Sequence, residues 1–232
     1  MNEICTKILK RFNEVDNNFY KIDLHMHSTW TDGKDSVVEV VKQAESIEMN
    51  FIAITDHIRS TSTYYPEYDK ETRSIKSNVK VLAGFEARIK NFKGELDVAK
   101  EVREDADIRV ASVHRFPFAG KLFAADLFSK ESAQAVELDL CLAGLEFGGF
   151  DILGHPGGMC LKQFGEFSSE YFEQIIIACN KNNIAFEISA AYHQKVYEQL
   201  KEILKQHKPI VVFSSDAHAK ENIGKWISIL NS

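Results

Sequence analysis

The chain has 232 residues, of which 44% are hydrophobic and 27% are charged, and its formal net charge is −6 at pH 7. This length fits one large domain or two small ones, and the hydrophobic content, with 16 phenylalanines, is enough for a substantial core. The acidic charge argues against a surface built for nucleic-acid backbones. It leaves a locally positive pocket open, because net charge does not describe a single site.

The sequence also argues against secretion and membrane insertion. Glu3, Lys7, Lys10 and Arg11 interrupt the apolar residues near the N-terminus, so we expect no secretory signal. No apolar run approaches the length of a membrane-spanning helix. The four cysteines have no CxxC spacing, which favours reduced structural thiols; they are Cys5, Cys141, Cys160 and Cys179. We therefore expect a cytoplasmic protein that binds no membrane.

The first predicted element is an amphipathic helix within residues 1–19. Cys5, Ile8, Leu9, Phe12 and Val15 follow helical spacing. We expect this helix to pack on the remainder of the chain, residues 20–232, although it could instead bind a partner.

Short apolar runs then alternate with helical patterns along the rest of the chain. Strands are predicted at residues 20–24, 51–55, 80–85, 109–113, 150–153, 184–188 and 210–214. Helices are predicted at residues 36–47, 66–77, 130–145, 169–182, 195–207 and 221–230. Residues 87–107 are polar and irregular, and we expect an active-site loop with a short helix there.

This alternation predicts an α/β fold. Strand ends recur about every thirty residues, which is the length of one βα unit. Seven such strands favour a distorted (β/α)7 TIM-like barrel, slightly short of the usual eight. An open doubly wound sheet is the alternative, but it would collect ligands only from the few strands near a switch point.

Metal-binding side chains follow most of the predicted strands. These nine residues are His25, His27, Asp32, His57, Glu86, His114, His155, Asp216 and His218. Because the carboxyl ends of barrel strands meet at one rim, the side chains should converge there. Imidazole combined with carboxylate is a metal-binding donor set. Each motif alone has a structural interpretation, such as a turn for Asp32, but together they predict a metal-dependent hydrolase.

Six segments resemble the PHP (polymerase and histidinol phosphatase) family. They are HMHSTWTDG, ITDH, GFE, ASVH, DILGHP and SSDAH, in this order, and the resemblance covers residues 20–224. The stretch from Gly94 to Asp97, followed by Val110 to His114, is also similar to the PHP domains attached to bacterial family X DNA polymerases. No polymerase domain is present, so we expect a stand-alone member.

The resemblance implies a trinuclear metal centre at the C-terminal rim. The first metal would be held by His25, His27, Glu86 and Asp216; Glu86 would bridge to a second metal, bound also by His114 and His155; and the third would be held by Asp32, His57 and His218. Many relatives have His where this chain has Asp32. We expect two to three divalent transition metals, Zn²⁺, Mn²⁺ or Fe²⁺. The implied reaction is attack of a metal-bridging hydroxide on a phosphoester, with catalytic roles for Glu86, Asp216, His218 and Arg115.

The expected substrate is a small phosphomonoester, as for a histidinol phosphatase. Guanidinium groups suit phosphate, and Arg115, Arg88 and Arg59 each follow a ligand by one or two residues. Lys162 is a weaker candidate. His193 is assigned to substrate contact, although a solvent-exposed loop histidine is the other interpretation.

Two alternative functions remain open. One is a nuclease or phosphodiesterase acting on nucleotides or nucleic-acid ends, which should carry a basic groove. The other is a non-catalytic regulatory module, which should bind metal without hydrolysing anything.

Overall fold

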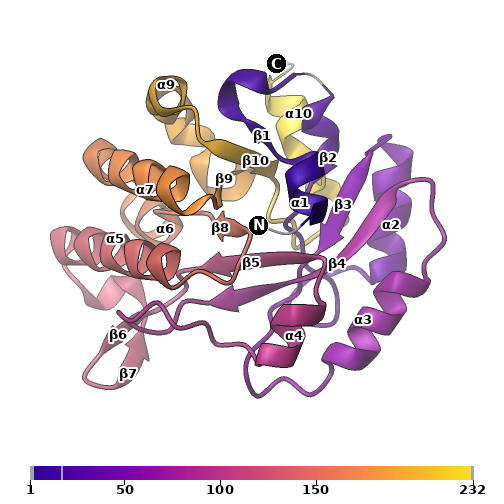
Figure 1. Ribbon diagram of the computed structural model, residues 1–232, viewed down its shortest axis with the longest axis horizontal. Coiled ribbons are helices and arrows are strands. Elements are labelled where there is room, and N and C mark those ends of the chain that lie inside the picture. The colour runs from indigo at the N-terminus through magenta and orange to yellow at the C-terminus, as the bar shows by residue number, and fades with distance from the viewer. Residues whose placement is uncertain (1–2, 17, 231–232) are drawn as a thin grey trace.

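The computed structural model describes residues 3–16 and 18–230, and its centre is a curled sheet (Figure 1). The strand order in this sheet is β1-β10-β9-β8-β5-β4-β3-β2, and every pair is parallel except β1 with β10. The strands are β1 (Lys10–Arg11), β2 (Ile22–Asp23), β3 (Phe51–Ile54), β4 (Lys80–Arg88), β5 (Ile108–Ser112), β8 (Ile152–Gly154), β9 (Ala185–Ser189) and β10 (Ile210–Ser214).

The sheet closes between β2 and β10. Just beyond the ends of these strands, Met26 and Ala217 form an isolated parallel bridge, and the His27 amide donates to the Ala217 carbonyl at 2.8 Å. Seven parallel strands therefore form a distorted barrel, as predicted, and the open doubly wound alternative is wrong.

Helices cover the outside of the sheet and alternate with its strands (Figure 1). They are α1 (Glu3–Ile8), α2 (Val37–Ser46), α3 (Tyr65–Ser74), α4 (Lys100–Asp105), α5 (Lys130–Phe147), α6 (Gly158–Phe164), α7 (Ser169–Asn182), α8 (Ala190–His193), α9 (Tyr197–His207) and α10 (Lys225–Leu230). Short 3-10 helices are η1 (Phe12–Glu14), η2 (Phe19–Lys21), η3 (Ala125–Leu127), η4 (Gln194–Val196) and η5 (Lys220–Asn222). In the described part of the chain, no helix is both long and apolar enough to cross a membrane.

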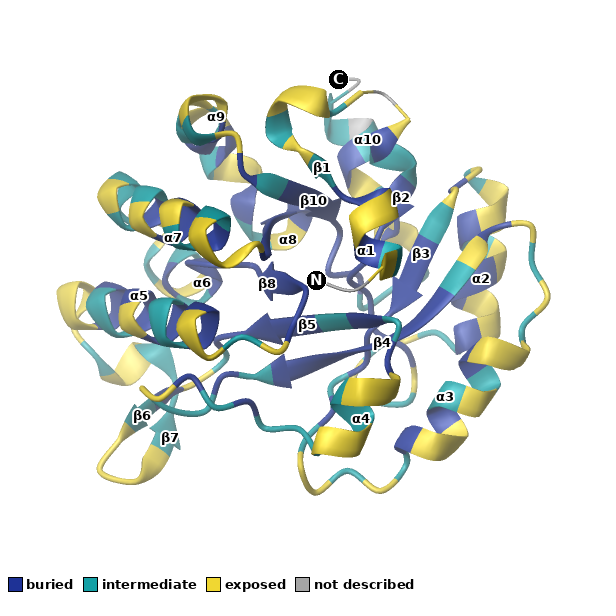
Figure 2. Cartoon of the chain, in the orientation of Figure 1, coloured by how far each residue is buried: buried dark blue, intermediate teal, exposed yellow. Residues whose placement is uncertain are grey.

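Local sequence explains the helices that face the sheet. In α2, the Ser36 hydroxyl accepts from the Glu39 amide and the Glu39 carboxylate accepts from the Ser36 amide, which is a capping box. Val37, Val40 and Val41 then lie on one buried face. Figure 2 shows the same division into buried and exposed faces on the other long helices.

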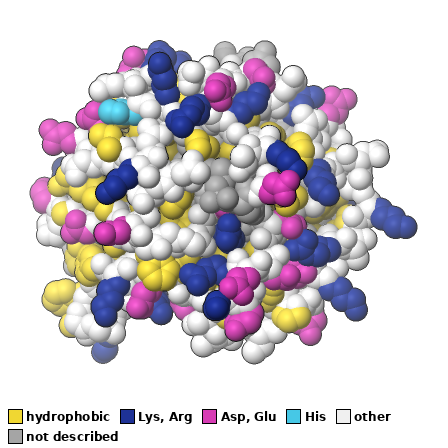
Figure 3. Space-filling view, in the orientation of Figure 1, with side chains coloured by type: hydrophobic (Ala, Val, Ile, Leu, Met, Phe, Trp, Pro, Cys, Tyr) yellow, Lys and Arg dark blue, Asp and Glu magenta, His cyan; other side chains and the backbone are white. Residues whose placement is uncertain are grey.

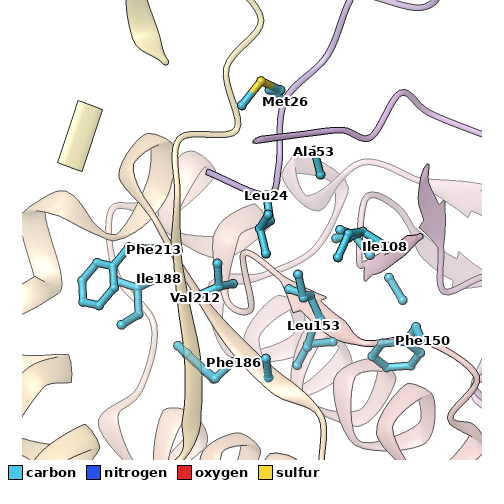
Figure 4. Close-up of a cluster of buried hydrophobic side chains, with 14 of the residues drawn as sticks. Leu24, Met26, Ala53, Ile108, Phe150, Leu153, Phe186, Ile188, Val212 and Phe213 are labelled. Carbon is cyan, nitrogen blue, oxygen red and sulfur yellow. The ribbon is translucent and has the colours of Figure 1, made fainter. Parts of the chain in front are cut away.

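The core lies on both faces of the curled sheet. Leu24 follows β2, and Ile108, Leu153, Phe186 and Val212 lie in β5, β8, β9 and β10; all five are fully buried (Figure 4). Phe186 packs against Phe172 of α7, with ring centroids 6.4 Å apart in an edge-on arrangement, so part of this core lies between the strands and the helices. Strands with apolar residues on both faces are typical of parallel sheets covered by helices. This packed core holds the strands in place, so the side chains at their carboxyl ends project from well-defined backbone positions.

The N-terminal segment differs from its prediction. The helix ends at Ile8, and Lys10 and Arg11 continue as β1, pairing with Val211 and Ile210. Strand β10 would otherwise have an unpaired edge there, and an extended segment satisfies its backbone groups. The helix therefore does not continue to Phe12 and Val15, because the chain pairs with β10 instead, and the spacing of apolar residues does not reveal such a pairing.

A hairpin after β5 was not predicted. It consists of β6 (Phe116–Phe118) and β7 (Lys121–Phe123), and its two turn residues, Ala119 and Gly120, have positive φ angles of 47° and 75°. Two-residue hairpin turns need such angles, for which Asn-Gly is the usual signal. Ala-Gly is a weaker signal, which explains the omission.

Candidate metal centre

All nine predicted ligand residues meet at the carboxyl end of the sheet. Four overlapping groups have donor atoms within 4.8 Å of one another: His27, Asp32, His57 and His218; His25, Glu86 and His155; His25, His27 and Asp216; and His57, Glu86 and His114. The barrel explains this convergence, because β2, β3, β4, β5, β8 and β10 each deliver their residues to the same rim.

Glu86 lies at the centre of the cluster. Its Oε1 atom is 3.0 Å from His114 Nε2, 3.1 Å from His155 Nε2 and 3.4 Å from His25 Nε2, and its Oε2 atom is 2.8 Å from His57 Nδ1. Burial of this carboxyl opposes its ionisation, but His114, His25 and His57 outweigh burial and lower its pKa well below the usual range. Glu86 is therefore a buried carboxylate whose two oxygens face different imidazoles.

Asp32 occupies the outer side of the cluster. Its Oδ2 atom is 3.3 Å from His57 Nε2 and 3.4 Å from His218 Nε2, and its side chain is about half exposed. Hydrogen bonds from His218 and His57 lower the pKa of Asp32. Burial lowers the pKa of His57, but Glu86 and Asp32 overcome this effect and raise it to about 9. Asp32 thus faces the imidazoles in addition to lying in a turn.

The donor atoms fit a metal-binding role. Several buried atoms make no hydrogen bond within the described residues, including His25 Nε2 and His27 Nδ1. His57 Nδ1 and Glu86 Oε2 also make none, because their 2.8 Å contact does not have hydrogen-bond geometry. A buried polar atom without a hydrogen bond costs about 1–3 kcal/mol, so this concentration of such atoms favours a bound cation. Divalent transition metals accept lone pairs from this mixture of imidazole and carboxylate.

Two of the predicted ligands have an unusual backbone conformation. The φ angles are 30° at His155 and 52° at Asp216, a region that residues other than glycine adopt at a cost of about 1–3 kcal/mol each. Preceding His155, Gly154 is required for close packing, because a Cβ atom there would lie 2.1 Å from Ser112 Oγ. Such conformations persist where the surroundings hold them in place.

Sequence reasoning missed Glu187, which helps to hold His155 and His25 in place. It is fully buried on β9, with Oε1 2.8 Å from His25 Nδ1, and Oε2 accepts from the His155 amide at 2.6 Å. A carboxylate bonded to the outer nitrogen of a ligating histidine fixes its tautomer and orientation. A lone acid within the apolar run 184–188 was the signal that could have identified it.

His193 is not part of the binding site. It is fully buried, its Nδ1 atom accepts from the Ser189 amide at 3.0 Å, and Nε2 donates to the Pro156 carbonyl at 2.9 Å. Burial lowers its pKa to about 4. Both interpretations of His193, substrate contact and solvent-exposed loop residue, are therefore wrong: its two bonds connect the segments that follow β9 and β8.

A cavity of about 740 Å³ opens over the cluster, and all three predicted arginines line it. Arg88 Nη2 is 2.5 Å from Asp97 Oδ2, and Arg59 donates to the carbonyls of Ile58 and Glu86. Arg115 is exposed and has no ion pair within the described residues. Of the three, Arg115 is thus the guanidinium most available to a ligand. Lys162 also lines the cavity.

The sequence matches the PHP domain over residues 23–191. The chain belongs to the PHP domain family. A probable phosphatase of Proteus mirabilis is 25% identical over 220 residues, which cover 91% of this chain and 84% of that protein. The DNA polymerase/3′-5′ exonuclease PolX of Bacillus subtilis is 27% identical over 183 residues, but these cover only 29% of that protein.

Solved structures with the same PHP fold include a histidinol phosphate phosphatase of Lactococcus lactis, in complex with zinc, L-histidinol and phosphate. Its TM-score is 0.72 at 21% identity, covering 91% of each chain. A candidate histidinol phosphatase of Listeria monocytogenes has a TM-score of 0.73 at 20% identity, covering 89% of this chain and 98% of that one. The family, its phosphatase relatives and the ligand cluster identify this chain as a metal-dependent phosphoesterase.

Proposed function

We propose that the chain hydrolyses a small phosphomonoester, in the manner of a histidinol phosphatase, at a centre of two to three divalent metals. The observation that carries this proposal is Glu86, a buried carboxylate whose two oxygens face four imidazoles at 2.8–3.4 Å.

We propose three ligand sets, of which the first two share Glu86. We assign His25, His27, Glu86 and Asp216 to the first metal, Glu86, His114 and His155 to the second, and Asp32, His57 and His218 to the third. Bound together, such metals lower the pKa of a water molecule and neutralise charge that develops on a phosphate. Zinc in the Lactococcus lactis protein supports Zn²⁺, and Mn²⁺ or Fe²⁺ suit the same donors.

The remaining roles belong to side chains that line the cavity. Arg115 would donate charge-assisted hydrogen bonds to phosphate oxygens, with Arg88 and Arg59 as further candidates. Asp216 and His218 also line the cavity, and we assign them to orienting the attacking water. Glu86 lines the same cavity but is fully buried, and we assign it to holding the metals of the centre together.

The relatives favour a small substrate over a polymer. Those that match nearly the whole chain are named phosphatases, whereas the polymerase relative matches only through part of its length. Figure 3 shows the face that carries α1, where basic and acidic side chains are interspersed; the histidine cluster is not visible on this face. We also propose a cytoplasmic location, because all four cysteines are buried thiols rather than disulfides.

The test combines metal analysis with a substrate panel. Gently purified protein should contain two to three metals per chain, and reconstituted protein should hydrolyse phosphomonoesters faster than phosphodiesters or oligonucleotides. Glu86→Gln should be the most damaging single change to metal content. Glu137→Gln is the matched control, since Glu137 is equally buried but accepts the Met159 and Cys160 amides instead of facing imidazoles.

Each competing outcome has a different meaning. Less than one metal per chain after reconstitution would refute the multinuclear centre. Full metal content without any turnover would support the regulatory alternative, and preferential cleavage of diesters would support the nuclease.

A further inference from the structure

A second cavity lies beside the first. Its volume is about 430 Å³, and its lining residues are Leu161, Lys162, Ala190, Ala191, Tyr192, Gln194, Lys195 and Lys225. Lys162, Ala191 and Tyr192 line both cavities, so the two share a wall. A ligand that occupies the first cavity can therefore extend toward the second.

The second cavity is positively charged. Lys162 comes from α6, Lys195 from η4 and Lys225 from α10, and none of the lining residues is acidic. Neither Lys162 nor Lys195 has an ion pair within the described residues, whereas other lysines of this acidic chain pair with a glutamate, as Lys130 does with Glu166. The like charges of Lys162 and Lys195 repel each other, and a bound anion would relieve this repulsion.

The shared wall is held in a fixed position relative to the metal centre. The Tyr192 ring lies 4.7 Å from the ring of the predicted ligand His155, measured between centroids. The next residue, His193, bonds to the Pro156 carbonyl and the Ser189 amide. These contacts connect α8 to the segment that carries His155, so the wall shared by the two cavities lies directly beside the metal cluster.

We propose that the lysine-lined cavity binds a second anionic group of the substrate. The substrate class is then an organic phosphomonoester whose leaving group carries a further phosphate or carboxylate. This inference rests on the proposed phosphatase function and narrows its substrate. Lysine ammonium groups are point charges on flexible stems, so they accept either anion without the planar geometry that arginine selects.

Matched substrates test the inference. Metal-reconstituted protein is assayed with the monophosphates of linear diols of increasing length, and with analogues in which the distal hydroxyl is replaced by phosphate or by carboxylate. At the favoured length, the compound with the second anionic group should have a KM about tenfold below that of the hydroxyl compound, a ratio that corresponds to about 1.4 kcal/mol, because the lysine ammonium groups attract the added anion. Comparison of the phosphate and carboxylate analogues identifies the preferred anion.

The double variant Lys195→Gln/Lys225→Gln should abolish this difference and leave the KM of the hydroxyl compound unchanged. Lys162 stays intact because it also lines the metal cavity. The matched control is Lys42→Gln/Lys181→Gln, which removes two exposed positive charges that lie outside both cavities. It should retain the full preference.

Three results would overturn the inference: equal KM values for all the analogues, an equal rise in KM for every compound in the lysine variant, or the same loss in the control. Calorimetric binding of the same compounds to metal-loaded protein gives a second measurement. If no phosphomonoester is turned over, the proposed phosphatase function fails. Even then, tighter binding of the analogue with the second anionic group to the original protein than to the lysine variant would establish the anion site.

Discussion

Replacing Glu187 by glutamine should weaken metal binding although Glu187 is not a predicted ligand. Its two oxygens serve two donors, His25 Nδ1 and the His155 amide. With the proton on Nδ1, His25 Nε2 presents its lone pair to the cluster, where it lies 3.4 Å from Glu86 Oε1. A glutamine side chain has one accepting oxygen and one donating NH₂, so one of the two donors would face another donor.

The expected loss follows from this conflict. His25 must either keep its proton on Nδ1 without an acceptor or move the proton to Nε2, where it blocks the lone pair. Changes to groups that orient a ligating histidine cost about 10–100-fold in metal affinity, which corresponds to about 1.4–2.8 kcal/mol. The His155 amide, whose residue has a φ of 30°, would lose support as well.

The assay is competition for Zn²⁺ between metal-free protein and a chromophoric chelator. Glu137→Gln is again the control, because Glu137 also accepts two amides at 3.0 and 2.9 Å and contacts no predicted ligand. Both variants should lose stability, and only Glu187→Gln should lose metal affinity. Equal affinities in Glu187→Gln and the original protein, or equal losses in both variants, would refute the tautomer argument.

Three further predictions concern other groups. Burial lowers the pKa of His193 from 6.5 to about 4 in the folded chain. Its neutral form therefore contributes stability that is full above pH 6.5 and is lost as the pH falls toward 4, by about 3 kcal/mol. Urea unfolding in the presence of a chelator should show a flatter dependence of the unfolding free energy on pH for His193→Gln than for the original protein, and parallel dependences would contradict this role. Burial raises the pKa of all four cysteine thiols and so keeps them from forming reactive thiolates. Replacing any one cysteine by alanine should therefore leave turnover nearly unchanged. A loss of about a hundredfold in turnover would reveal a cysteine that acts as a nucleophile or metal ligand. Arg115→Ala should keep its metals but lose about 2–4 kcal/mol of transition-state stabilisation, measured as kcat/KM. Arg115→Lys should recover only part of this loss. Unchanged kcat/KM in Arg115→Ala would assign the phosphate contact to Arg88, Arg59 or Lys162, and loss of metal from this variant would make Arg115 a structural support of the site.

Much of the barrel could be predicted because strand ends carry their own chemical signal. The last strand, residues 210–214, and the helix at residues 169–182 have the predicted bounds. Apolar runs followed by His or Asp specify both a buried strand and its exit to the rim. The nine candidate ligands converge for the same reason, since parallel strands share one direction.

The remaining features depend on contacts between distant segments. Strand β1 forms because the edge of β10 offers backbone partners, and nothing near Lys10 indicates this. The sequence positions of Glu187 and His193 do not indicate their roles. Glu187 lies inside an apolar strand but bonds to His25 of the cluster, whereas His193 lies near the rim but is buried and bonds to the Pro156 carbonyl. Sequence gives the position of a side chain along a strand, whereas its partner depends on which neighbours the closed barrel brings to it.

Closure of the barrel through one bridge also determines the order in which the centre can be assembled. His27 Nε2 and Asp216 Oδ1 are 3.1 Å apart but separated by 189 residues in sequence. An ion bound to both would act as a cross-link that turns most of the chain into a ring. For a permanent link of this span, the chain-entropy estimate is about 5 kcal/mol, an upper limit for coordinate bonds. The nine predicted ligands come together only after β10 has docked beside β2, so metals held by the proposed ligand sets would bind in full only after the barrel has closed.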